Sequence, residues 1–139
     1  MTPGTANSGA GDAGAGDAGT GSPATEDLAR IAARAADAKK GEEIVILDVG
    51  DIMGIVGSFV IVGAANTRLV RTIVEEVEHA LTDQAAVKPR AVEGLDDCRW
   101  VLLDYGDLVV HVFLDETREF YGLERLWADA ARVPWQAAV

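Results

Sequence analysis

Acidic side chains and one histidine interrupt the apolar runs in the last third of the chain. Asp107 lies in a Gly106-Asp107 pair that is typical of a tight hairpin turn, and His111 follows four residues later. A turn aspartate near a strand histidine can form a charge-assisted hydrogen bond that raises the imidazole pKa, as in a general acid/base pair. More often such a pair is structural, with the aspartate capping the turn and the histidine making one hydrogen bond in a half-buried strand. We therefore favour a structural or interface role for Asp107 and His111 over catalysis.

A second group of residues has the side-chain types that serve as contact anchors. Trp100 and Tyr121 offer large ring surfaces with few rotatable bonds, and Arg118 is suited to bidentate contact with a carboxylate or with carbonyl groups, inside the domain or across an interface. Arg118, Tyr121 and Glu124 are spaced by three residues, which predicts that they lie along one side of a helical turn. Packed core is an equally good interpretation of Trp100, and for Trp127 it is the better one.

Two β-rich runs flank the turn and predict a hairpin of strands at residues 100–105 and 108–114. Side chains alternate between the two faces of a strand, so Trp100 and Asp104 share one face and Val101 lies on the other. Because Asp104 is polar, we expect the face that it shares with Trp100 to be at least partly open to solvent.

The rest of the chain alternates between helix and strand patterns. We expect one helix from Thr25, as its N-cap, to Lys40, and a long amphipathic helix that begins at Asn66 or Thr67. The remaining expected elements are buried strands at 44–48 and 58–62, an edge strand at 87–93 and a short helix at 123–131. This order predicts an α/β fold with a mixed five-stranded sheet flanked by helices.

Composition predicts one domain with an unstructured start. Residues 1–24 are rich in Gly and Ala and are expected to be a disordered extension, followed by a domain at 25–133 and a tail at 134–139. Cys98 is the only cysteine, which excludes an intramolecular disulfide and a cysteine-based zinc site. We expect neither a signal peptide nor a membrane-spanning segment, so a cytoplasmic location without membrane contact is the simplest interpretation.

The charge balance is strongly acidic and bears on the choice of partner. The formal net charge is -11, and residues 93–129 carry ten acidic side chains against three arginines. Binding to a phosphate backbone depends on Lys and Arg, so we expect little direct contact with nucleic acid. An acidic surface instead favours encounter with a basic protein, although a solvated surface that maintains solubility would have the same composition.

Residues 93–127 match a known signature at fixed spacing. The matching positions are, in order, Glu93-Gly94, Trp100, Leu102-Leu103-Asp104-Tyr105-Gly106-Asp107, Val109-Val110-His111, Phe113, Arg118, Phe120-Tyr121, Leu123-Glu124 and Leu126-Trp127. This pattern resembles the signature of the ribosomal silencing factor family, also called the Iojap-like family. The resemblance is specific because about a dozen polar and aromatic positions match together, and it extends upstream to cover about residues 26–130.

The resemblance implies a noncatalytic translation repressor that needs no cofactor. Family members bind the large ribosomal subunit through its protein L-fourteen, where they block association with the small subunit when nutrients are scarce. Their fold is similar to that of nucleotidyltransferases, here without the catalytic carboxylates. The partner-binding residues that we predict are Trp100, Val101, Asp104, Asp107, His111, Arg118, Tyr121 and Glu124. The apolar hairpin could also pair edge to edge and form a homodimer when the protein is free.

The nucleotidyltransferase-like fold raises one alternative, a divergent Mg²⁺-dependent nucleotidyltransferase. Such enzymes combine a Gly-Ser helix start with an Asp-x-Asp strand that holds the metal. Gly57-Ser58 is present, but no Asp-x-Asp follows it, and the available acids are Asp48, Asp51 and Asp104. We therefore favour the silencing factor. The chain departs from its family at Val56-Gly57-Ser58, where members usually have Thr-Asp-Tyr or Thr-Asp-Phe. If that aspartate shapes the partner surface in other members, Asp51 must make its polar contact here, or the contact is lost.

Overall fold

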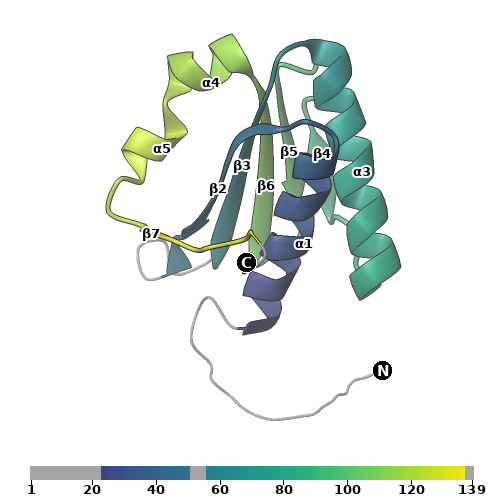
Figure 1. Cartoon of the computed structure of the whole chain (residues 1–139), viewed down its shortest axis with the longest axis vertical. Helices are drawn as coiled ribbons and strands as arrows, with labels where there is room; N and C mark the ends of the chain where they lie inside the picture. Colours follow the sequence, from purple (N-terminus) through teal and green to yellow (C-terminus); the bar gives the residue numbers. More distant parts are fainter. Residues whose placement is uncertain (1–22, 51–55, 137–139) are drawn as a thin grey trace.

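The computed structural model describes residues 23–50 and 56–136 (Figure 1). The predicted disordered extension therefore lies outside the described residues, except for Pro23 and Ala24, which begin helix α1 (Pro23–Ala38). The prediction of Thr25 as the N-cap is wrong, because Thr25 lies inside this helix. Proline is favoured at the first helical position, where its missing N–H would have no intrahelical partner.

A six-stranded mixed sheet, in the order β4-β5-β6-β3-β2-β7, forms the centre of the molecule. The strands are β2 (Glu42–Asp48), β3 (Ser58–Ala64), β4 (Ala91–Glu93), β5 (Trp100–Asp104), β6 (Leu108–Leu114) and β7 (Ala131–Arg132). Of the strand pairs formed by the described residues, β3 and β6 are parallel and the others are antiparallel. The mixed sheet between helices is confirmed, and β4 is an edge strand as predicted. The expected number of five strands is wrong, because β7 is too short to show an alternating pattern in the sequence.

The predicted hairpin of β5 and β6 is confirmed, but it lies inside the sheet. β5 is covered by β4 on one side, and β6 is covered by β3 on the other. The hairpin therefore has no free edge through which it could pair with a second copy. The outer strands, β4 and β7, have three and two residues, which is short for pairing with a second chain.

Helices α1 and α3 (Thr67–Ala85) cover one face of the sheet and pack against each other (Figure 1). Asn66 caps α3 as predicted, because its side-chain oxygen accepts a hydrogen bond from the backbone N–H of Leu69 at 2.8 Å. The apolar stripe of α3 is buried, as its helical spacing predicts. Alanines form the buried side of α1 and let that helix approach α3 and the sheet closely.

The opposite face carries two short helices, α4 (Asp115–Tyr121) and α5 (Leu123–Leu126). Gly122 separates them with a left-handed φ of 58°, which ends α4. The single helix predicted at 123–131 is therefore shorter, and Arg118, Tyr121 and Glu124 do not share one helical turn as their spacing suggested. A smaller apolar cluster, centred on β3 and β6, fills the space beneath these helices.

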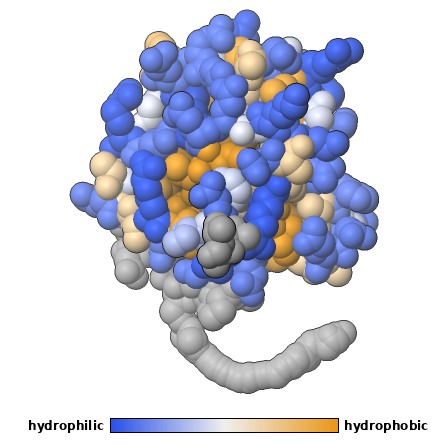
Figure 2. All heavy atoms as spheres, viewed as in Figure 1, coloured by the Kyte–Doolittle hydropathy of each residue, from blue (hydrophilic) through white to orange (hydrophobic). Residues whose placement is uncertain are grey.

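The surface seen in Figure 2 is mostly hydrophilic, and hydrophobic atoms are visible mainly in the middle of that face. Among the described residues, no helix combines the length and apolar character that a membrane crossing needs. After β7, the chain stays attached to β2, because Val133 donates to the carbonyl of Ile46 and the Trp135 indole donates to the carbonyl of Ile44. This attachment extends the β2 edge of the sheet beyond β7.

Candidate partner-binding site

Side chains of β5 alternate as predicted between the core and the more open face of the sheet. Trp100 and Asp104 are half-buried on the face that carries α4, whereas Val101 is 0% exposed beneath the α1 and α3 layer. Val101 therefore contributes to the core and has no surface that a partner could touch. Our prediction of it as a contact residue is wrong, because β-strand alternation turns its side chain inward.

An aromatic cluster surrounds Trp100. Its indole stacks on the Phe113 ring at 4.8 Å between centroids and lies 4.8 Å from the ring of Tyr121. Phe120 follows in edge contact with Tyr121 and is 79% exposed, although it was not among the predicted partner-binding residues. A helix as short as α4 shows no periodicity that would have marked Phe120 as exposed. We call the set Trp100, Phe120 and Tyr121 the aromatic surface.

His111 lies in the middle of β6 beneath this surface and is only 4% exposed. Its Nδ1 accepts a hydrogen bond from the indole Nε1–H of Trp100 at 3.1 Å. Burial lowers the pKa of His111 to about 4, so the ring is neutral near pH 7. The charge-assisted bond to Asp107 and the raised pKa that the acid/base alternative requires are not found, because four residues of strand separate the two positions by about 13 Å. The favoured structural interpretation holds for His111, which makes one hydrogen bond within a strand, although to Trp100.

Asp107 instead organises the hairpin turn through its backbone. Its carbonyl accepts hydrogen bonds from the N–H groups of Gly57 and Ser58, which ties the turn to the start of β3. Its side chain is exposed. The carboxylate of Asp104 accepts from the N–H of Gly106 at 2.8 Å, so both acids stand at one end of the sheet. Ser58 is fully buried, and this part of the Val56-Gly57-Ser58 departure therefore lies in the core.

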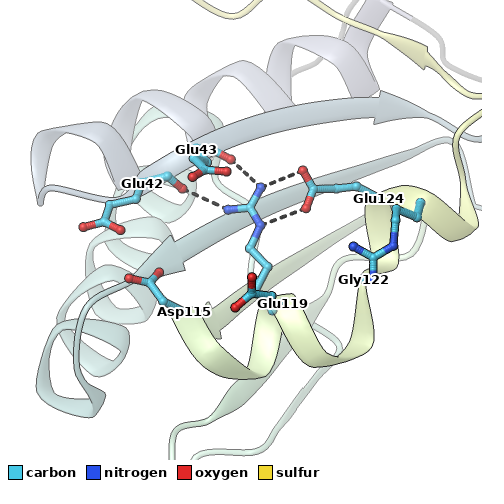
Figure 3. Close-up of a pocket in the computed structure, with 8 residues that line it drawn as sticks. Glu42, Glu43, Asp115, Glu119, Gly122 and Glu124 are labelled. Carbon is cyan, nitrogen blue, oxygen red and sulfur yellow. Dashed lines mark hydrogen bonds and ion pairs between the residues drawn. The ribbon is translucent and has the colours of Figure 1, made fainter.

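Arg118 links α4 to the sheet and to α5 from a buried position, with 8% of the residue exposed. Its guanidinium donates to both carboxylate oxygens of Glu124 at 2.9 Å and to the backbone carbonyls of Glu42 and Glu43 (Figure 3). The bidentate contact predicted for Arg118 is confirmed, and it is made inside the domain. The hydrogen bond from Arg118 lowers the pKa of Glu124.

Further carboxylates surround this buried guanidinium. Glu42, Asp115 and Glu119 line the same pocket (Figure 3). A hydrogen bond between the side chains of Glu42 and Asp115 raises the pKa of Glu42, and their like charges act in the same direction. In the part of the chain that the structure describes, no three His, Cys, Asp or Glu side chains come together as a metal site would require.

Two of the three acids considered for the enzyme interpretation lie on different strands. Asp104 ends β5 and Asp48 ends β2, with β6 and β3 between them. Three strand spacings of about 4.8 Å separate these positions by roughly 14 Å. Such a distance is too long for both carboxylates to bind one Mg²⁺. Asp51, the third acid considered, lies outside the described residues.

Comparison with known proteins identifies the family. A family model described as "Ribosomal silencing factor during starvation" matches residues 22–138. Ribosomal silencing factor RsfS of Bacillus subtilis is 38% identical over 105 residues, covering 76% of this chain and 88% of that protein. A crystal structure of a protein from Chromobacterium violaceum, 29% identical, matches with a TM-score of 0.72 and covers 83% of this chain and 93% of that chain.

A shorter match joins residues of this chain to a eukaryotic protein. It is 50% identical over 36 residues, which are 26% of this chain and 16% of the mouse protein named mitochondrial assembly of ribosomal large subunit protein 1. The family model covers most of the chain, and the Bacillus subtilis protein is similar over most of its own length. The resemblance predicted from residues 93–127 is thus confirmed: this chain belongs to the ribosomal silencing factor family.

Proposed function

We propose that this protein binds the large ribosomal subunit through its protein L-fourteen and obstructs the docking of the small subunit, which represses translation when nutrients are limited. The observation that carries this proposal is the aromatic surface, in which Phe120 and Tyr121 are exposed and Trp100 is half-buried, on a face that α1 and α3 leave uncovered. Large rings held on a rigid sheet are typical anchors of protein interfaces. We expect the protein to act in the cytoplasm.

The residues that we propose as direct contacts are those with accessible side chains. They are Trp100, Asp104, Asp107 and Tyr121 from the predicted set, joined by Phe120. His111 and Arg118 are buried behind them, and the partly exposed Glu124 is held by Arg118; together these three residues support β5, α4 and α5. Apart from Val101, which lies in the core, the predicted set therefore divides into residues that we propose to touch the partner and residues that support them.

Charge supports a protein partner over RNA. The acidic side chains outnumber the arginines by seven in residues 93–129, and ribosomal proteins are generally basic. Opposite charge accelerates encounter and fixes the orientation of the two surfaces. A relative from mouse has a name that refers to the large ribosomal subunit, which favours that subunit as the target.

The action that we propose is obstruction without catalysis. The relatives are named as silencing factors, and the separation of Asp48 from Asp104 does not favour the transferase alternative. A bound factor prevents subunit joining by occupying space. This requires only that, at the concentrations present, the factor bind the large subunit more strongly than the small subunit does. No observation favours a second function over this one.

The direct test is co-sedimentation of the purified protein with isolated large subunits, followed by addition of small subunits. We expect the protein to co-sediment and to prevent the subunits from joining. The Trp100→Ala variant should bind more weakly by at least about 1 kcal/mol, the usual scale for a contact anchor, and should still unfold cooperatively. Unchanged affinity together with a collapse of stability would show that Trp100 acts only as core.

A further inference from the structure

Trp100 forms a wall shared by two depressions in the surface. One is lined by Asp97, Arg99, Glu116, Thr117, Phe120 and Tyr121 together with Trp100. The other is lined by Glu93, Gly94 and Leu102 together with Trp100. The shape of both depressions therefore depends on the orientation of one indole ring.

His111 is an unusual residue for its position on the adjacent strand. It is buried among apolar and aromatic side chains, with the Phe59 ring in edge contact at 4.8 Å and the Phe113 ring 6.2 Å away. No charged group contributes to its lowered pKa, which burial alone explains. Its Nε2 has no hydrogen-bond partner among the described residues. Because Nδ1 accepts from Trp100, the proton of the neutral ring belongs on Nε2, where it is left unpaired.

An unpaired buried N–H is destabilising, so the fold alone would favour an apolar ring at position 111. What histidine adds over phenylalanine is the acceptor for the indole of Trp100. A half-buried tryptophan without such a bond is free to occupy more rotamers, and any that are populated must be restricted on binding. A hydrogen bond from the nitrogen edge, added to ring contacts with Phe113 and Tyr121, selects one orientation.

We infer that His111 is a positioning residue for the proposed interface, whose Nδ1 holds the Trp100 indole in its binding orientation before the partner arrives. The predicted effect of His111 on affinity for the large subunit rests on the proposed function. Its effect on the orientation of the Trp100 indole rests on the structure alone. The two effects are measured separately. The exchange rate of the indole N–H reports the hydrogen bond, and the affinity for isolated large subunits reports the consequence.

The experiment uses the full-length protein and the variants His111→Phe and His111→Asn. The three tryptophans of the chain give separate indole N–H signals in NMR spectra, and Trp100→Phe assigns the relevant one. In His111→Phe, the exchange of the Trp100 indole N–H with solvent should accelerate by at least about tenfold. Affinity for large subunits should fall about threefold to tenfold, because the ring must be ordered on binding.

His111→Asn places an amide oxygen near the position of Nδ1 and should restore much of the protection and affinity. His79→Phe is the matched control, because this second histidine is exposed on α3, and it should change neither quantity. If His111→Phe leaves both the exchange rate and the affinity unchanged, the inference is wrong. If exchange accelerates while affinity for the subunit stays constant, the indole is positioned as described but His111 does not contribute to docking.

The wild-type protein provides a measurement that needs no folded variant. Its Trp100 indole N–H should exchange more slowly than that of Trp127, and equal rates would overturn the inference even if His111→Phe failed to fold. Failure of the proposed function looks different. In that case Trp100→Ala would bind large subunits as tightly as the wild type, although the indole N–H of the wild type stayed protected.

Discussion

Replacing Arg118 by alanine should test whether the buried guanidinium holds the supporting layer together. The side chain makes two hydrogen bonds to the Glu124 carboxylate and two to the carbonyls of Glu42 and Glu43. Arg118→Ala removes all four and leaves one carboxylate and two carbonyl oxygens facing the space that the guanidinium occupied. These groups come from α5 and from the start of β2, so their loss should separate both from α4.

The magnitude follows from burial. Removing one partner of a buried ion pair costs about 3–5 kcal/mol, because the remaining charge is left without compensation. The side chain of Glu124 is 25% exposed, so water can reach part of the carboxylate and the cost should fall at the lower end. We expect Arg118→Ala to reduce the free energy of unfolding by about 3 kcal/mol, a large part of the 5–15 kcal/mol typical of a domain.

Urea denaturation followed by circular dichroism measures this change at pH 7. Arg125→Ala is the matched control, because Arg125 lines the same pocket but is exposed, and it should alter stability by no more than about 0.5 kcal/mol. Arg118→Lys should recover only part of the loss, since an ammonium group cannot reproduce the planar fork. A loss below about 1 kcal/mol in Arg118→Ala, or an equal loss in Arg125→Ala, would refute this account of the pocket.

Three other predictions concern the titration of a buried ring, a tight loop and the acidic end of the sheet. The pKa of His111 is about 4 in the folded protein against an ordinary 6.5, so the stability that the neutral ring provides is fully present above pH 6.5 and declines as the pH falls below it. Linkage predicts that the free energy of unfolding drops by about 2 kcal/mol between pH 7 and pH 5 on account of this ring, and urea denaturation of His111→Phe should not show this drop. Gly94→Ala should lower stability by about 1–3 kcal/mol or more in urea denaturation, because Gly94 has φ 94° and an added Cβ would lie 2.1 Å from a backbone oxygen. Charge reversal of Asp104 and Asp107 to lysine should slow association with large subunits at low salt, whereas Asp83→Lys on α3 should not; equal rates in stopped-flow or surface-based assays would contradict the electrostatic argument.

Local patterns were sufficient to predict the long elements. The apolar stripe of α3, its Asn66 cap and the alternation of β5 follow from the helical repeat, from one side chain and from the two-residue repeat of a strand. Signals of this kind depend only on neighbours within a few residues. The same holds for the hairpin, whose turn needs the positive φ of Gly106.

Partners that are distant in sequence could not be predicted in this way. Arg118 binds carbonyls of Glu42 and Glu43, more than seventy residues earlier, and Trp100 rather than Asp107 pairs with His111. Both outcomes depend on which strands become neighbours and on the register between them. The addition of β7 to β2 has the same origin, since a two-residue strand carries no pattern of its own.

Sequence by itself therefore determined the family, the α/β class, the acidic character of the last third and most of the residues that form the candidate site. These features depend on the types of the side chains and on their spacing along the chain, and neither of these changes with folding. Only the tertiary structure decided which of those residues are accessible. Val101, His111 and Arg118 are buried while Phe120 is exposed, because burial depends on the packing of α4 and α5 over one face of the sheet and of α1 and α3 over the other.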